Sequence, residues 1–252
     1  MADTIFEQAE ELQERVILVG VMEQEGEDIE GSLDELGDLA LTAGAQVCGR
    51  LIQKRERIHP GTYIGKGKLE ELQLLIAQTG ATGIICDDEL SSVQMHHLQE
   101  ALECKIMDRT LLILDIFAKH ARSSEGKIQV ELAQLKYRAS RLSGLGKSLS
   151  RLGGGIGTRG PGEKKLEMDR RLIRTRISHL KQELEEVVRH REVIRTSRER
   201  GGRKLAALVG YTSVGKSAIF NRLTGADVLE DARLFATLDT TTRGVPLSSG
   251  QE

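Results

Sequence analysis

The stretch that most constrains the fold of this chain lies at residues 210–217, which read GYTSVGKS. Two glycines with four residues between them, followed by Lys and Ser, form the phosphate-cradling pattern of a P-loop. Such a loop joins a buried parallel strand to a helix. The pattern therefore predicts a strand over residues 205–209 (LAALV) and, after Gly215, a helix with an apolar face that stops at Gly225.

The residue types of this loop suit a nucleotide phosphate. Backbone N–H groups near Gly210 and Gly215 would form an anion nest, Lys216 would bridge the β- and γ-phosphates, and the Ser217 hydroxyl would ligate Mg²⁺. The alternative is a glycine-rich turn that happens to contain Lys and Ser. We assign nucleotide binding to the whole loop: Gly210, Tyr211, Thr212, Ser213, Val214, Gly215, Lys216 and Ser217.

Charge is divided unevenly along the chain. The whole chain has 36 Lys and Arg against 38 Asp and Glu. Residues 122–204 carry 22 of the basic residues and 10 of the acidic ones, which leaves 14 against 28 elsewhere. This asymmetry is typical of nucleic-acid contact, and its alternative is a long helix with a solvated basic face.

Composition places the chain among soluble intracellular proteins. No apolar run approaches the ~18 residues of a membrane span, and the acidic start (MADTIFEQAEELQER) lacks the basic and apolar regions of a signal peptide. The chain has three cysteines, an odd number, and no CxxC pair: Cys48, Cys86 and Cys104. This pattern favours reduced thiols in the core over disulfides or a zinc site. We expect a cytoplasmic protein.

The first half of the sequence alternates strand-like and helix-like stretches. Residues 15–22, 45–53, 82–87 and 105–108 read as strands, and residues 32–44, 68–80 and 90–102 read as helices. The series predicts an α/β domain over residues 1–121, with a parallel sheet covered by helices. The segment HPGTYIGKGK at 59–68 is either an anion-binding loop or a plain surface loop.

The hydrophobic period changes to heptad-like spacing over residues 122–203. Two apolar seams predict an antiparallel helical hairpin: Ile128, Leu132, Leu135, Ala139 and Leu142 in the first helix, and Ile173, Ile177, Leu180, Leu184, Val187 and Ile194 in the second. The connection at 143–165 is rich in glycine and in Lys and Arg, and predicts a flexible basic loop that orders on RNA phosphates. For the shorter of the two helices, a single helix packed on the first domain is the alternative.

These residues, in this order, closely resemble the HflX family of ribosome-associated GTPases. The resemblance rests on PGTYIGKGKLEEL, EGKIQVELAQLKY, LGGGIGTRGPGEKKLEMDRR and GYTSVGKSAIFNRLTG, and it covers the chain from about residue 15. GGGIGTRGPGE, at 153–163, is its most specific motif.

The resemblance implies a function and a set of sites. It implies a Ras-like GTPase domain beginning at residues 204–252, with GTP and Mg²⁺ as ligands, in a monomer that binds the large ribosomal subunit and its RNA and couples GTP hydrolysis to ribosome splitting or recycling. Residues 235–239 would be the first switch (Phe235, Ala236, Thr237, Leu238 and Asp239), in which Thr237 would join Ser217 on Mg²⁺. The RNA-binding residues would be Lys147, Arg151, Arg159, Lys164 and Lys165.

The chain departs from the family pattern at several points. Ala218 stands where Thr is usual, Lys164 and Lys165 stand where Thr-Gln is usual, and Thr240 stands where Pro is frequent. Only 42 residues follow Gly210, without DxxG or NKxD, whereas a nucleotide-binding domain needs about 100 residues or more.

Three hypotheses stay open at this stage. The shortness after Gly210 predicts a truncated GTPase domain, for which we name no catalytic base. A hydrolysis-deficient RNA-binding module, acting as a functional short form, is the second hypothesis. An unrelated P-loop ATPase with a coiled-coil arm is the third, since the motif that reads guanine is missing from these residues.

Overall fold

The computed structural model describes residues 14–24, 26–152, 161–200, 206–211, 214–226 and 241–245. Side chains are described for these residues apart from 143–152, 161–166 and 198–200. The chain divides into two compact units, Met1–Ile113 and Leu114–Glu252, which are taken in turn.

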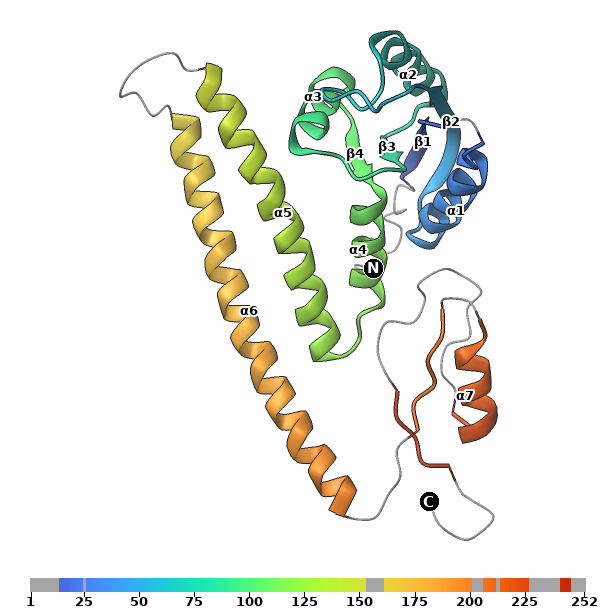
Figure 1. Ribbon diagram of the computed structural model, residues 1–252, viewed down its shortest axis with the longest axis vertical. Helices are drawn as coiled ribbons and strands as arrows, with labels where there is room; N and C mark the ends of the chain where they lie inside the picture. Colours follow the sequence, from blue (N-terminus) through green and yellow to red (C-terminus); the bar gives the residue numbers. More distant parts are fainter. Residues whose placement is uncertain are drawn as a thin grey trace, which may run out of the picture. The chain divides into compact units, whose positions relative to one another are not determined.

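The first unit is built on a four-stranded parallel sheet with strand order β2-β1-β3-β4 (Figure 1). Its strands are β1 (Arg15–Met22), β2 (Gln46–Lys54), β3 (Gly83–Cys86) and β4 (Lys105–Asp108). The connecting helices are α1 (Ile29–Thr42), α2 (Lys66–Thr79) and α3 (Ser92–Leu102). The predicted parallel α/β architecture is confirmed, with each predicted strand and helix within a few residues of its expected place.

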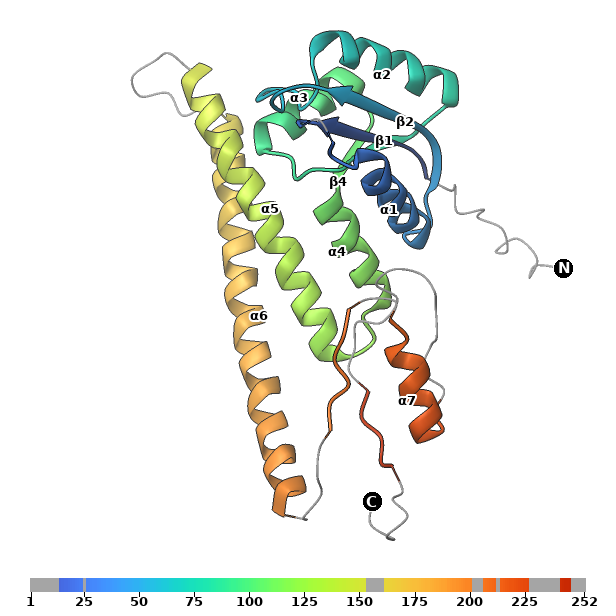
Figure 2. The same ribbon diagram turned by 45° about the vertical axis from the view of Figure 1, so that its right-hand side comes forward.

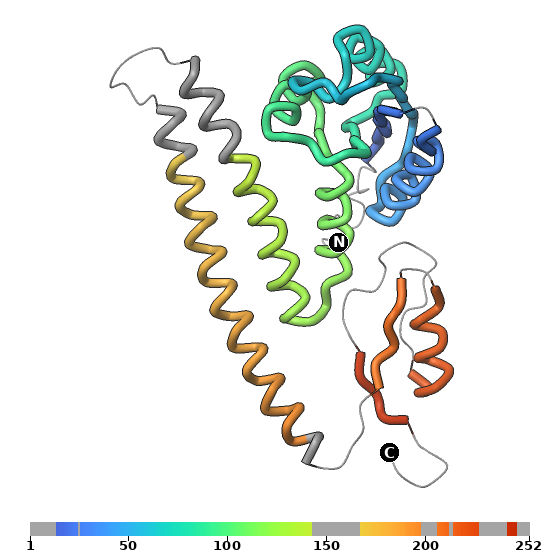
Figure 3. Tube along the Cα trace, in the orientation of Figure 1, coloured from blue at the N-terminus to red at the C-terminus, as the bar shows by residue number. Residues whose placement is uncertain are grey.

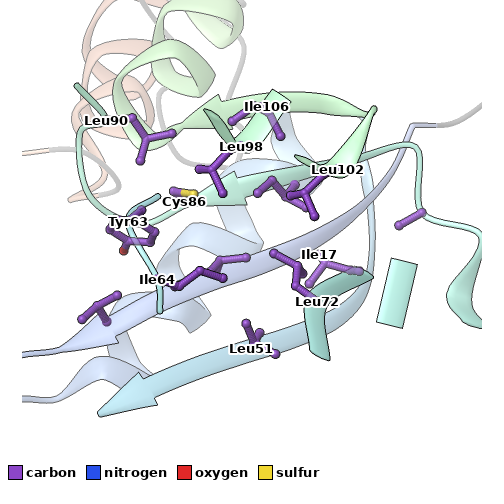
Figure 4. Close-up of a cluster of buried hydrophobic side chains, with 14 residues drawn as sticks. Ile17, Leu51, Tyr63, Ile64, Leu72, Cys86, Leu90, Leu98, Leu102 and Ile106 are labelled. Carbon is purple, nitrogen blue, oxygen red and sulfur yellow. The ribbon is translucent and has the colours of Figure 1, made fainter. Parts of the chain in front are cut away.

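β1 is central in the sheet and is buried on both faces, as its unbroken apolar run predicts. Ile17 and Val19 belong to the larger core cluster with Leu72 of α2 and Leu98 of α3 (Figure 4). On the other face, a Cβ placed on Gly20 would lie 3.0 Å from Ile29 at the start of α1, so this helix packs closely on the strand. α1 therefore covers one side of the sheet, and α2 and α3 cover the other (Figure 2).

Local signals in the sequence explain where the helices begin and end. The Ser91 hydroxyl accepts a hydrogen bond from Gln94 N, and the Gln94 side chain accepts one from Ser91 N, a capping box that starts α3. Gly80 ends α2 in the left-handed conformation, at φ 64°. α1 begins a turn earlier than predicted because the Asp28 carboxylate accepts a hydrogen bond from Gly31 N at 2.9 Å.

A fourth helix, α4 (Arg109–His120), follows β4 directly and was not among the predicted elements. Its first residue is tied to the first unit, because Arg109 Nη2 lies 2.5 Å from Asp87 Oδ1 and donates to the Ser32 carbonyl at 2.9 Å. Arg109 Nη1 also lies 3.1 Å from Glu35 of α1. The guanidinium therefore joins the end of β3, α1 and the start of α4.

The segment 59–68 forms a loop up to Gly65 and then the start of α2, and the loop is anchored by Tyr63, which is 1% exposed and has φ 67°. Its phenol donates a 2.6 Å hydrogen bond to Asp88 Oδ2, just beyond β3. Burial raises the pKa of the Asp88 carboxyl above 3.8, although the hydrogen bond from Tyr63 acts in the opposite direction. The protonated form of Asp88 is therefore favoured in the folded protein relative to the unfolded chain.

This pKa shift predicts a pH-dependent contribution to stability. Because the folded protein binds more protons at Asp88 above pH 3.8, its free energy of unfolding should fall as pH rises through the shifted pKa. Asp88→Asn, which is neutral at every pH, should lose less stability than the unaltered chain as pH rises from 3.8 through the raised pKa of Asp88 in urea titrations. Parallel pH profiles for the two proteins would contradict the assignment.

The three cysteines are free thiols that pack in or against the core of the first unit. Cys86 of β3 is fully buried, and burial raises the pKa of its thiol well above its usual value. Cys48 and Cys104 are partly buried against the same cluster. The three residues therefore act as small apolar side chains.

The predicted antiparallel hairpin is present in the second unit as α5 (Ser124–Leu152) and α6 (Pro161–Arg200), whose arms run side by side (Figure 3). The predicted seam residues of α5 are all at least half-buried, and Leu180 of α6 is fully buried. Ile194, the last predicted seam residue, is 39% exposed.

The prediction of an irregular loop over residues 143–165 was too long. α5 continues to Leu152 and α6 begins at Pro161, so only residues 153–160 lie outside the described chain at this turn. The physical reason lies in the sequence, where Leu145, Leu149 and Leu152 continue the three-and-four spacing of the seam. Pro161 is also well suited to the first position of a helix.

Ion pairs join the two arms of the hairpin. Arg176 of α6 makes two hydrogen bonds to Glu131 of α5, at 2.8 and 2.9 Å. Arg191 pairs with Glu125 nearer the other end of the seam. Hydrogen bonding from Arg176 lowers the pKa of Glu131. The two arginines therefore serve the pairing of the helices.

Candidate nucleotide-binding loop and basic hairpin

The helix expected after the P-loop pattern is present as α7 (Lys216–Thr224). Gly215 precedes it with φ 84°, a left-handed conformation that glycine adopts without strain. Gly225 ends it with φ 64°, and its N–H donates to the Asn221 carbonyl at 2.8 Å. Both predicted helix boundaries are confirmed.

Lys216 folds back across the loop instead of extending into solvent. Its Nζ atom donates a hydrogen bond to the carbonyl oxygen of Tyr211. A Cβ atom on Gly210 would lie 3.1 Å from Val214 Cγ2 and 3.7 Å from Lys216 Cδ, so the lysine stem lies close to the start of the loop. The Lys216 ammonium therefore lies beside Tyr211, and its side chain lies close to Gly210.

The start of α7 offers donors for an anion. No side chain caps this helix, and the first N–H groups of any helix have no partner within it. Lys216 and Ser217 are its first two residues, and both are half-buried. The ammonium group and the helix N-terminus together suit a phosphate, and the Ser217 hydroxyl is of the type that ligates Mg²⁺ in such loops.

The predicted buried strand at 205–209 is not found in the described part of this segment. Residues 206–211 have no regular structure, and Leu208 and Val209 are 48% and 90% exposed. A strand needs a neighbour for its N–H and C=O groups, and every strand pair of the described residues lies in the first unit. The apolar residues of α7 share this exposure, since none of its residues is buried.

An open depression on α7 is lined by Ala218, Ile219, Arg222 and Leu223. It follows the body of the helix, away from Gly210 and Gly215. Its lining is almost wholly apolar, which does not suit a phosphate. We therefore assign it to the exposed apolar face of α7, apart from the candidate nucleotide loop.

Several residues assigned from the sequence lie outside what the structure describes. Among the nucleotide residues these are Thr212, Ser213 and the first switch with Thr237. Arg159 lies among residues 153–160, which are outside the described residues. Lys147 and Arg151 fall within α5, and Lys164 and Lys165 fall within α6, where the helix is described but these side chains are not.

The structure refines the interpretation of the basic segment. Arg176 and Arg191 count toward its net charge, yet each is paired with a glutamate of the opposite arm. Three further arginines make no such pair within the described residues: Arg170, Arg171 and Arg174. The sequence analysis did not assign them a role. The spacing of charges alone could not separate the two groups, because cross-hairpin partners depend on the register of the two helices.

The structure also bears on membrane association. Within the described ranges, we find no helix with the length and apolar character needed to cross a bilayer.

Comparison with known protein families accounts for most of the chain in three consecutive segments. Residues 30–118 match a family described as GTP-binding GTPase N-terminal. Residues 120–198 match GTP-binding GTPase Middle Region, and residues 205–251 match 50S ribosome-binding GTPase. These matches correspond to the first unit, the hairpin and the P-loop segment.

Curated relatives align with nearly the whole of this chain. The GTPase HflX of Lacrimispora saccharolytica is 62% identical over 242 residues, which cover 96% of this chain and 57% of the relative. The GTPase HflX of Caldanaerobacter subterraneus subsp. tengcongensis is 56% identical over 239 residues, covering 95% and 55%. The chain thus spans a little more than half the length of these relatives.

A solved structure supports the fold. The crystal structure of SsGBP in complex with GDP aligns with a TM-score of 0.51 at 23% sequence identity, over 85% of this chain and 56% of that one. At this identity the likeness concerns the fold alone. The family matches, the identity to curated relatives and this shared fold agree, and the chain belongs to the HflX GTPase family.

Proposed function

We propose that this chain binds GTP with Mg²⁺ through residues 210–217 and associates with the large ribosomal subunit through its basic hairpin. In this proposal the nucleotide state sets ribosome affinity, and GTP hydrolysis is coupled to ribosome splitting or recycling. The observation that carries it is the loop itself, in which Gly215 starts α7 and Lys216 folds back to the Tyr211 carbonyl. Membership of the HflX family supports guanine over adenine as the base.

The residues of the loop would act by charge and position. Lys216 would exchange its hydrogen bond to the Tyr211 carbonyl for one to a phosphate oxygen, so its positive charge is already in place when the nucleotide arrives. Backbone N–H groups at the start of α7 would hold the same phosphates. Mg²⁺ would neutralise phosphate charge during transfer, with the Ser217 hydroxyl as one of its ligands.

The hairpin would supply the ribosome contact. Its net positive charge suits ribosomal RNA, and the match of residues 205–251 to 50S ribosome-binding GTPase supports the large subunit as the partner. We retain Lys147, Arg151, Arg159, Lys164 and Lys165 as proposed RNA-binding residues, because they surround the turn between the two arms.

A second candidate function follows from the exposed surroundings of the loop. Residues 206–211 are exposed and α7 buries none of its residues, so the described part of the segment shows no packing of the kind that normally holds a phosphate loop rigid. This observation favours an RNA-binding module that does not hydrolyse GTP. Both candidates share the hairpin contact and differ only in the nucleotide step.

A titration of the purified chain with fluorescent GTP and ATP analogues in Mg²⁺ separates the candidates. We expect saturable binding of the GTP analogue through the P-loop residues, and a preference for GTP over ATP would support guanine as the base. Absence of binding, with sedimentation of the chain on large ribosomal subunits unaffected by nucleotide, would favour the RNA-binding module. Equal affinity for ATP and GTP would contradict the assignment of guanine.

A further inference from the structure

We propose that Arg170, Arg171 and Arg174, near the start of α6, form a cluster that binds RNA phosphates. We refer to these three residues as the arginine cluster. The inference rests on the proposed association with ribosomal RNA and extends it, because it assigns a phosphate contact to described side chains on the helical arm of the hairpin.

The arginines of α6 fall into two groups. Arg176 lies 2.8 Å from Glu131, and Arg191 pairs with Glu125, so their charges are compensated within the hairpin. In the described part of the chain, no member of the arginine cluster pairs with an acidic side chain, although Glu167 and Asp169 directly precede it. The positive charge of the hairpin is therefore concentrated toward its turn.

Spacing brings the members of the cluster together on the helix. Arg170 and Arg174 are four residues apart, and Arg171 and Arg174 are three apart, so their side chains are neighbours on the helix surface. Like charges at these spacings destabilise an isolated helix. A bound anion would relieve this repulsion.

Arg170 is held in place by the opposite arm. Its Nη2 atom donates a hydrogen bond to the carbonyl oxygen of Leu142 in α5. Its Nε atom is buried and has no hydrogen-bond partner among the described residues. The described residues therefore satisfy only some of the hydrogen-bond donors of this guanidinium. Arg171 and Arg174 are exposed beside it. A fixed charge with two adaptable neighbours is well suited to a backbone phosphate.

RNA is favoured over an acidic protein by continuity along the chain. Lys164 and Lys165 precede the cluster by a few residues in the sequence, and Arg159 lies earlier still. A basic surface that extends over this length fits the repeated charges of a nucleic-acid backbone. Arginine is also the residue that matches phosphate with two parallel hydrogen bonds.

The test compares two triple variants of the full chain with the same loss of charge. The first replaces the cluster with glutamine (Arg170→Gln, Arg171→Gln, Arg174→Gln), and the control replaces Arg176, Arg189 and Arg191 with glutamine. Binding to purified large ribosomal subunits is measured by sedimentation over a range of salt concentrations, and circular dichroism confirms that both variants keep their helix content.

The cluster variant should bind about 10- to 100-fold more weakly at low salt, and the slope of log affinity against log salt should fall by about 2. The control should change affinity by less than about threefold with little change of slope, because two of its arginines are already paired. Equal losses of affinity and equal salt slopes in the two variants would overturn the RNA-binding role of the arginine cluster and leave the proposed function in place. Failure of the unaltered chain to bind subunits would instead overturn the proposed function, and the cluster with it.

Protein-free large-subunit RNA, used as a second probe, identifies the partner. An equal loss of affinity on this RNA would support phosphate recognition. If the cluster variant lost affinity for intact subunits but kept its affinity for the RNA, the cluster would contact an acidic ribosomal protein. This result would overturn the assignment to RNA.

Discussion

Replacement of Lys216 with Ala should weaken binding of GTP analogues by at least about 100-fold, the equivalent of about 2.7 kcal/mol. The ammonium group is the only side-chain charge that the structure places across residues 210–216 among the described residues, through its hydrogen bond to the Tyr211 carbonyl. Charge-assisted hydrogen bonds to phosphate are worth about 1.5–3 kcal/mol each, and Lys216 would reach two phosphates. Fluorescence titration in Mg²⁺ measures the loss directly.

Arg222→Ala is the matched control for this variant. Arg222 lies in the last turn of the same helix and is exposed, so its removal takes one positive charge from α7 at a distance from the loop. We expect less than about a threefold change, which is the range for a solvent-screened charge. Equal losses in the two variants would show a general effect of charge and would contradict the role assigned to Lys216.

The second large effect is on the stability of the hairpin. Leu180→Ala should lower the free energy of unfolding by about 2–3 kcal/mol, because it removes a fully buried side chain from the seam between α5 and α6 and leaves a cavity. Urea unfolding followed by circular dichroism measures the change. The midpoint should shift, and the steepness of the transition should be retained if the hairpin unfolds with the rest of its unit.

Leu172→Ala makes the same chemical change on the same helix at a side chain that is 64% exposed. This substitution should change the free energy of unfolding by no more than about 0.5 kcal/mol, as surface substitutions in general do. If the two variants were equally destabilised, burial of Leu180 in the seam would not be the source of the effect, because Leu→Ala does not lower helix propensity. If neither had an effect, the pairing of α5 with α6 would contribute little to unfolding in solution.

The first unit could be predicted closely from the sequence because its signals are local and agree with one another. The apolar run of β1 is typical of a strand buried on both faces, and Gly80 and Ser91 mark helix ends through their own backbone and side-chain chemistry. α4 was missed because it follows β4 without a turn, so no Gly or Pro separates Asp108 from Arg109.

The candidate site was less predictable because it depends on partners distant in sequence. The pattern GYTSVGKS correctly predicts the start of α7 after Gly215. It cannot decide whether residues 205–209 pair with other strands, since strand formation depends on a neighbour. Likewise, only the register of α5 against α6 shows that Arg176 meets Glu131 while Arg170 meets a carbonyl group.

The central position of β1 has a consequence for how the protein is made. β1 pairs with β2 on one side and with β3 on the other, and its partner residues in β3, 83–86, lie far along the chain from 16–19. During synthesis, both edges of β1 can therefore be covered only after β3 has left the ribosome. Until then its apolar run is open to misfolding or to chaperones, whereas helices such as α2 can form as soon as their own residues have emerged.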